Sequence, residues 1–308
     1  MPAFMAIYQY NVDRMRRESM KRKRKNLSSY LFLLPAFIIY MSVIVFPVLY
    51  SVYISLFKWN GISDMVFVGL SNYINLLTND PIFLKAVANN LIWTALSLVI
   101  TTTVALALAV ALNKKFRGRT FFRGYFYFPA VIAPIAVAII WRWIYNPQFG
   151  FINAVLGTLG VPFQQSWLSN PNVSLYAIFV ASLWQSVGQP MILFLAGLQT
   201  VPTEVLEAAT IDGASNTRRF FVVVCPMMKE TFVVAIANLT VAAMKVYDIV
   251  QGLTGGGPNN STQMLSTYMY FQTFQYNKVG YGTAIACLMV VFMLVVIVPY
   301  LLFTTKEN

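Results

Sequence analysis

The chain has 308 residues, of which 58% are hydrophobic and only 10% are charged, and its mean hydropathy is +0.65. This small number of charged side chains cannot cover the surface of a large water-soluble core. The composition therefore excludes a soluble domain and indicates an integral membrane protein. With no His and two separate Cys, the sequence also argues against a transition-metal site and a disulfide framework.

The formal charge of +12 comes from basic residues in a few short polar stretches. Most of the 22 Lys and Arg residues lie in 14–25, 114–123 or 218–229, or at Lys306. These stretches fall on one side of the membrane once the apolar segments are counted, so the positive-inside rule explains the charge without a nucleic-acid partner. We interpret residues 1–29 as a basic cytoplasmic tail that touches anionic membrane lipid.

Six apolar segments follow, each longer than the roughly 20 residues that a membrane-spanning helix needs. They are residues 31–57, 85–112, 121–145, 173–199, 229–251 and 281–303. We therefore predict an all-α membrane protein with six transmembrane helices over residues 30–303 and with both termini, including 304–308, in the cytoplasm. The loops 113–120 and 200–228 are then cytoplasmic, and 58–84, 146–172 and 252–280 are external.

The external loops carry their own signals. Residues 67–81 have apolar side chains at helical spacing, which predicts a short amphipathic helix on the membrane surface, capped by Ser71. The aromatic side chains between Trp141 and Tyr145 predict an anchor at the outer membrane interface. The glycine run in 253–258 lacks the Lys-Ser/Thr of a phosphate-binding loop, so we expect a tight turn there and no ATP hydrolysis by this chain.

Span four carries a stripe of polar side chains. They are Ser182, Gln185, Ser186 and Gln189, at the i, i+3, i+4 and i+7 positions of one helical face. A rise of about 1.5 Å per residue puts Gln185 near the bilayer centre, where Gly188 and Pro190 interrupt the helix. Polar groups are costly in lipid, and two roles justify them here: contact with a transported substrate, or hydrogen bonds to neighbouring helices.

A polar, charged stretch from Glu207 to Pro226 separates spans four and five. Thr203 is placed to cap a short helix that has Glu207 near its positive N-terminal end. We expect that helix to stop at Asp212-Gly213, because glycine tolerates left-handed backbone angles. The pattern predicts a helix-turn-helix just outside the membrane that serves as a docking surface.

This stretch resembles the cytoplasmic loop of the permease subunits of binding-protein-dependent ABC importers, whose pattern is Glu-Ala-Ala, three residues, Gly, nine residues, Ile-x-Leu-Pro. The chain matches it with Glu207-Ala208-Ala209, Gly213, Val223, Cys225 and Pro226, where Val and Cys replace Ile and Leu. The resemblance implies that the loop docks on a cytoplasmic ATPase and transmits its motion. The positions that it assigns to this contact are Glu207, Ala208, Ala209, Asp212, Gly213, Ala214, Phe220 and Pro226.

Two external segments are similar to the sugar-importing branch of the same family. They are the Gly-Leu-x-Asn-Tyr…Asp-Pro pattern of 69–81 and the Thr-x-Gly-Gly-Pro pattern of 254–258. The resemblance implies the permease subunit of an ATP-driven importer of a sugar or oligosaccharide in the bacterial inner membrane. The alternative is a secondary transporter driven by an ion gradient, for which Lys245 and Asp248 are the candidate coupling groups.

The same resemblance implies a set of partners. They are a second homologous permease subunit, a cytoplasmic ATPase dimer that carries ATP and magnesium, and an extracytoplasmic solute-binding protein. This chain itself is expected to have no catalytic residue, no metal and no cofactor. No nucleophile and base pair in the sequence supports a membrane-embedded enzyme.

In sugar permeases of this family, the helices before and after the conserved loop line the substrate cavity. The resemblance carries the substrate-facing positions onto two sets: Ser182, Gln185, Ser186 and Gln189, and Leu239, Ala242, Ala243 and Val246. The first set coincides with the polar stripe. The second set is small or apolar and offers no hydrogen bonds, so it either touches a sugar or makes space for one.

Span five also carries Lys245 and Asp248, three residues apart on one face of the predicted helix. They form either an intrahelical ion pair or a polar patch that recognises an acidic sugar. Trp184 beside Gln185, and Tyr247 beside Asp248, are candidates for stacking on sugar rings or for packing between helices.

Overall fold

The computed structural model describes residues 32–160 and 165–305. The chain divides into two compact units, Met1–Ile54 and Ser55–Asn308. The basic tail predicted over residues 1–29 lies outside the described residues.

In the first unit, one apolar helix runs from Phe32 to Ile54. It includes a π-helical turn, η1 (Met41–Val45), followed by α2 (Phe46–Ile54). The prediction that span one reaches residue 57 is wrong, because Phe57 belongs to a β-strand of the second unit.

The second unit is almost wholly helical in its described part. Its two short strands, β1 (Phe57–Lys58) and β2 (Val66–Phe67), pair antiparallel. Its helices are α3 (Ser71–Thr78), α4 (Pro81–Leu96), α5 (Thr102–Asn113), α6 (Arg119–Tyr127), α7 (Pro134–Ile144), α8 (Phe151–Thr158), α9 (Ser174–Ser186), α10 (Gly188–Gln199), α11 (Thr203–Ile211), α12 (Asn216–Arg219), α13 (Cys225–Met227), α14 (Lys229–Met244), α15 (Asp248–Leu253), α16 (Leu265–Tyr270) and α17 (Val279–Thr305). Short turns η2 (Ser97–Thr101), η3 (Phe128–Val131), η4 (Phe220–Val224) and η5 (Phe271–Gln275) join some of them.

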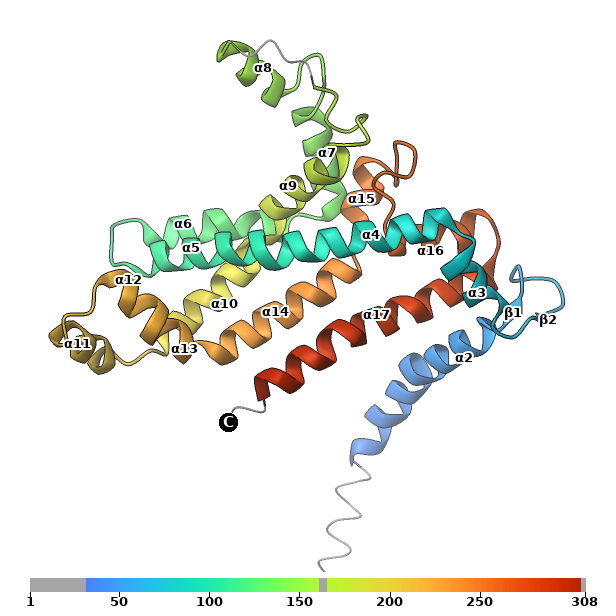
Figure 1. Ribbon diagram of the computed structural model, residues 1–308, viewed down its shortest axis with the longest axis horizontal. Helices are drawn as coiled ribbons and strands as arrows, with labels where there is room; N and C mark the ends of the chain where they lie inside the picture. The colour runs from blue at the N-terminus through green and yellow to red at the C-terminus, as the bar shows by residue number, and fades with distance from the viewer. Residues whose placement is uncertain (1–31, 161–164, 306–308) are drawn as a thin grey trace, which may run out of the picture. The chain divides into compact units, whose positions relative to one another are not determined.

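Within this unit, α4, η2 and α5 form one long apolar helix (Figure 1). α5 packs on α10, and α14 lies beside α17. α11 and α12 lie at one end of this bundle, and α3 and α16 lie at the other end (Figure 1).

Three described helices are long and apolar enough to cross a membrane: Phe32–Ile54, Pro81–Asn113 and Val279–Leu302. Three further pairs of helices pass the same test only together, because each pair is bent at a short break. The pairs are Arg119–Val131 with Pro134–Ile144 (100°), Ser174–Ser186 with Gly188–Gln199 (48°) and Asn216–Met227 with Lys229–Met244 (74°). The described residues therefore hold three unbroken apolar helices, and up to six spans if each bent pair counts as one. The last pair includes Asn216–Met227, which the sequence placed in the loop 200–228.

The breaks have local causes. Pro134 opens α7, where its fixed φ angle suits a helix start and its missing N–H costs no hydrogen bond. Gly188 opens α10, and a Cβ there would lie 2.7 Å from the carbonyl oxygen of Phe126. Only glycine permits this approach, so the predicted interruption of span four at Gly188 is confirmed as a close crossing of α10 over α6.

The prediction of one continuous helix over 229–251 is wrong. α14 ends at Met244, and Lys245 is its C-cap. A new helix, α15, begins at Asp248 after a residue with extended φ, Tyr247. Lys245 and Asp248 therefore do not share a helical face, and no ion pair joins them in the structure.

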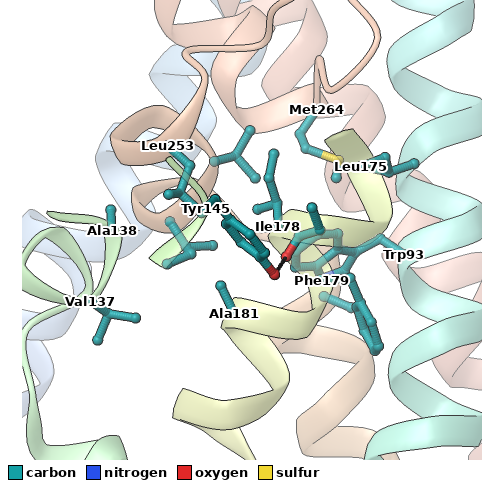
Figure 2. Close-up of a cluster of buried hydrophobic side chains, with 14 residues drawn as sticks. Trp93, Val137, Ala138, Tyr145, Leu175, Ile178, Phe179, Ala181, Leu253 and Met264 are labelled. Atoms are coloured by element: carbon teal, nitrogen blue, oxygen red, sulfur yellow. Dashed lines mark hydrogen bonds between the residues drawn. The ribbon is translucent and has the colours of Figure 1, made fainter. Parts of the chain in front are cut away.

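The buried cluster in Figure 2 joins α4, α7, α9, α15 and the start of α16. At its centre, Tyr145 is buried, and its hydroxyl donates a hydrogen bond of 2.8 Å to the Ala177 carbonyl (Figure 2). The predicted aromatic anchor is therefore wrong for Tyr145, whose ring packs in the core, whereas Trp143 is 66% exposed.

The amphipathic helix predicted after Ser71 is present as α3, but Ser71 is its first residue and does not cap it. The cap with side-chain hydrogen bonds lies one helix later, at Asp80. One of its carboxylate oxygens accepts from the backbone N–H groups of Ile82 and Phe83. The other accepts from the hydroxyls of Tyr268 and Tyr281, at 2.6 and 2.7 Å.

Candidate functional site

The polar stripe lies across the break between α9 and α10. Ser182, Gln185 and Ser186 are on the last two turns of α9 and are half-buried. Gln189 lies in the first turn of α10 and is exposed. All four side chains thus stand at the surface of this unit, where a substrate or a second subunit has access to them.

Gln185 differs from the other three, because its side-chain amide donates a 2.9 Å hydrogen bond to the Ile132 carbonyl. Ile132 lies between η3 and α7, where the 100° bend interrupts the backbone hydrogen bonds of the helix. An amide that satisfies a carbonyl freed by a broken helix stabilises the bend. This bond is a packing contact, one of the two roles that the sequence offered for Gln185. Across the described residues, the side chains of Ser182, Ser186 and Gln189 make no hydrogen bond.

At the helix break after α14, polar side chains from other segments form a second hydrogen-bond network. Asn90 of α4 donates to the Ala243 carbonyl at 3.2 Å and accepts from the backbone N–H of Leu265 at 2.8 Å. The hydroxyl of Ser266 donates to the Val246 carbonyl. Two carbonyls of the α14 end thus have side-chain partners, which lets the helix stop inside an apolar stretch.

The positions carried over to span five differ in their exposure. Ala242 is exposed, and Leu239 and Val246 are half-buried. Ala243 is 3% exposed and packs in the cluster of Figure 2. Its methyl group belongs to the core, so Ala242 is the small residue that this helix presents at the surface.

Lys245, Tyr247 and Asp248 lie at the same break. Lys245 and Asp248 are exposed, and Tyr247 is half-buried. Lys245 and Tyr247 line a pocket of about 360 Å³ together with Tyr270, whose ring centroid lies 5.3 Å from that of Tyr247. An amine beside two tilted aromatic rings offers both a hydrogen-bond donor and an apolar wall.

Trp184 stands on the α9 side, 38% exposed, with its ring edge-on to Trp141 at 6.0 Å between centroids. The ring is therefore partly used in packing. Trp184 directly precedes Gln185 of the polar stripe in the sequence.

The second candidate region is the helix-turn-helix of α11 and α12. The predicted helix is present, but it begins at Thr203 with Pro202 as its N-cap, so the prediction that Thr203 caps it is wrong. It ends as predicted: Gly213 is left-handed with φ of +74°. Gly213 donates its N–H to the Thr210 carbonyl, and Ala214 donates to Ala209, the two bonds of a Schellman motif.

A side chain that the sequence reasoning missed ties the two helices together. Arg219 at the end of α12 donates to the Thr210 hydroxyl at 2.6 Å and to the Asn216 side-chain oxygen at 2.9 Å. Thr210 in turn donates to the Leu206 carbonyl. The pair of helices is therefore held by its own side chains.

The residues assigned to ATPase contact present different surfaces. Glu207, Ala208, Asp212, Gly213 and Pro226 are exposed, and Ala209 and Ala214 are half-buried. Phe220 packs against the buried cluster around Phe194 and Met228. The exposed members lie on α11, on the turn after it and at Pro226, and Phe220 anchors the loop to the bundle.

The sequence reasoning also missed Asn90 and Asp80, although sequence features pointed to both residues. Asn89 and Asn90 stand within a predicted span, and a polar side chain in a span demands a partner. Asp80 precedes Pro81, a common pattern for a helix start. Their hydrogen-bond partners could not be predicted from the neighbouring sequence, because those partners are distant in the chain.

Comparison with known proteins identifies the family of this chain. Residues 102–306 match the family described as "Binding-protein-dependent transport system inner membrane component". The chain is 36% identical to the probable ABC transporter permease protein PH1215 of Pyrococcus horikoshii, over 90% of this chain and 95% of that protein. It is also 36% identical to the multiple sugar-binding transport system permease protein MsmF of Streptococcus mutans, over 90% and 96%.

Among solved structures, the fold is similar to that of a bacterial ABC transporter involved in the import of the acidic polysaccharide alginate. The TM-score is 0.80 at 20% identity, and the match covers 93% of this chain and 98% of that one. At this identity the likeness concerns the fold alone.

Proposed function

We propose a function from the premise that this chain belongs to the family of inner membrane components of binding-protein-dependent transport systems. It is a permease component of an ABC importer, a transport subunit rather than an enzyme. Nothing in these relatives supports the secondary-transporter alternative. We infer that its substrate is a sugar or oligosaccharide, an inference that its likeness to a multiple sugar-binding system permease supports.

The observation that carries the coupling proposal is the geometry of α11 and α12. A short helix with Glu207 on its exposed side, closed by a Schellman motif and tied to α12 through Arg219, is a rigid body at one end of the bundle. α10 leads directly into it and carries Gln189 of the polar stripe. We propose that the ATPase dimer docks here and that movement of α11 reaches the α9–α10 break through α10.

The remaining assembly is proposed on the same basis. A second homologous permease would cover the exposed polar stripe, the ATPase dimer would hold ATP and magnesium, and an extracytoplasmic solute-binding protein would deliver the sugar. We place the chain in the bacterial inner membrane with both termini in the cytoplasm, the basic tail over residues 1–29 and the six-span domain over residues 30–303.

Reconstitution tests this function. The full chain, with the proteins that co-purify with it, should take up a neutral trisaccharide such as maltotriose or an acidic oligosaccharide into proteoliposomes only when ATP is present. Uptake that continues without ATP and collapses with an ionophore would refute an ABC importer. Uptake of an amino acid but of neither saccharide would refute the sugar assignment alone.

The substrate positions need their own variant. Gln189→Leu removes an exposed amide that makes no hydrogen bond in the structure, so it should raise the KM for the sugar several-fold and leave thermal stability unchanged. Gln199→Leu, at the other end of α10, is the matched control and should change neither quantity. Equal KM values for both variants would contradict the assignment of Gln189 to the substrate path.

A further inference from the structure

A pocket of about 600 Å³ lies between the helix-turn-helix and the ends of two apolar helices. Its apolar wall includes Leu198, Val201, Leu206 and Phe220. Lys114 and Arg219 supply its charge, and no acidic side chain lines it in the described part of the chain. The pocket therefore combines an apolar wall with two cationic side chains.

Its position coincides with a membrane boundary. α5 ends at Asn113, the last residue of the apolar helix Pro81–Asn113, and Lys114 follows directly. Phe221, which lines the pocket, and Val222, which follows it in η4, are each 64% exposed. An apolar surface that continues from the pocket at the end of a spanning helix is exposed to lipid acyl chains.

The two cations lack a negative partner. Arg219 is oriented by two neutral groups, the Thr210 hydroxyl and the Asn216 side-chain oxygen. Across residues 32–160 and 165–305, neither Lys114 nor Arg219 forms an ion pair with a carboxylate. A guanidinium held in place and an amine across the same pocket suit a phosphate group, which accepts several charge-assisted hydrogen bonds.

We propose that this pocket binds an anionic phospholipid, with its phosphate between Lys114 and Arg219 and its acyl chains along the apolar wall. The bound lipid joins the end of α5 to α12 and holds the helix-turn-helix against the bundle, which makes coupling dependent on anionic lipid. This inference rests on the proposed function only in that the helix-turn-helix lies at the membrane surface and contacts the ATPase.

Other occupants fit less well. The N-terminal stretch 1–29 is strongly basic, so it would meet two like charges in the pocket. A docked ATPase would use the exposed part of α11 around Glu207 and Ala208, and neither residue lines the pocket. The charge and the apolar wall together favour a lipid over either protein segment.

The test uses native mass spectrometry of the purified full chain titrated with phosphatidylglycerol or phosphatidylcholine. A basic residue at the headgroup of a bound anionic lipid strengthens binding about fivefold, and this contribution falls off with distance from the headgroup. Lys114→Gln with Arg219→Gln should therefore weaken phosphatidylglycerol binding by about 25-fold. Lys115→Gln with Arg218→Gln is the matched control, because it removes the same charge from the neighbouring positions outside the pocket. It should leave phosphatidylglycerol binding within about twofold.

Further variants separate charge from folding. Arg219→Lys keeps the charge and should retain most of the binding. Lys114→Gln alone removes a side chain that makes no hydrogen bond in the structure, so it should fold normally and still lose about fivefold. Phosphatidylcholine binding should be the same for all of these proteins.

Three results would overturn the inference. The first is an equal loss of phosphatidylglycerol binding in the pocket and control variants. The second is complete displacement of the lipid by millimolar inorganic phosphate, which indicates a free-anion site. The third is loss of the ATPase partner by the pocket variant with lipid binding unchanged. Failure of the proposed function is distinguishable, since a chain that binds phosphatidylglycerol in this pocket but supports no ATP-driven uptake refutes the importer and leaves the lipid site standing.

Discussion

The helix-turn-helix of α11 and α12 and the network around α4 are held together in opposite ways. In the first, the hydrogen bonds of Gly213, Ala214 and Arg219 reach partners at most nine residues away, and the surface is largely exposed. In the second, Asn90 and Asp80 reach partners 153 to 201 residues away. The helix-turn-helix keeps its shape through local bonds, whereas the broken helices in the bundle depend on distant ones.

This contrast predicts that the bundle network governs global stability and that the loop governs coupling. Asp80 should give the largest effect, because its carboxylate accepts four hydrogen bonds. Burial and the neighbouring carboxylate raise the pKa of Tyr268, so that its hydroxyl remains a donor to Asp80. Asp80→Asn replaces one acceptor by a donor that faces two hydroxyls, and it should lower the free energy of unfolding by about 3 kcal/mol.

Thermal unfolding of the full chain in detergent measures this loss. Asp64→Asn, on the exposed loop between β1 and β2, is the control and should leave the midpoint unchanged. Equal midpoints for Asp80→Asn and the unmodified chain would mean that the two tyrosine contacts do not stabilise the bundle.

The next largest effect is expected at Asn90. Asn90→Leu leaves the buried Leu265 N–H without a partner and removes the side-chain donor to the Ala243 carbonyl, which keeps the Val246 N–H. The change should cost about 2 kcal/mol. Because both groups border the break after α14, hydrogen exchange of 243–247 should accelerate as well. Asn238→Leu, at an exposed position of α14, should show neither change; an equal loss there would attribute the effect to leucine rather than to the lost bonds.

At Gly213, the effect on coupling should exceed the effect on stability. A Cβ at this residue meets no atom within 4 Å, so only the left-handed φ of +74° opposes a side chain. Gly213→Val should cost about 1 kcal/mol and loosen the turn, lowering the amount of sugar transported per ATP hydrolysed. Gly213→Asn, which tolerates this conformation better, should keep most of the coupling. A transport ratio unchanged by Gly213→Val would show that the turn is not part of the coupling element.

The smallest effect is expected at Thr210. Thr210→Val removes the acceptor of the Arg219 guanidinium at an exposed site, which should cost about 0.5 kcal/mol. Hydrogen exchange of α11 and α12 should rise while exchange in α4 stays the same. Faster exchange in α4 would contradict the separation between local and distant bonds.

The sequence by itself determined the class of protein and the end of α11. The composition excluded a soluble core, and Asp212-Gly213 marked the end of α11, because a helix stop depends on the backbone freedom of the glycine there. The interruption at Gly188 was also predicted from the sequence, although the glycine there is required by the close approach of the Phe126 carbonyl. The glycine run after Leu253 also forms the expected turn, with Gly255 and Gly256 left-handed.

Only the tertiary structure decided where the helix after Lys229 ends and which partners the polar side chains contact. Nothing between residues 229 and 251 marks a helix end. α14 stops where Asn90 and Ser266, from distant segments, donate hydrogen bonds to the Ala243 carbonyl and to the Val246 carbonyl just beyond the helix. Likewise, the pairing of Gln185 with Ile132 depends on a bend in another helix. Side-chain spacing reports the face of a helix, but the partner on that face comes from the fold, since hydrogen bonds across the bundle join residues that the sequence keeps far apart.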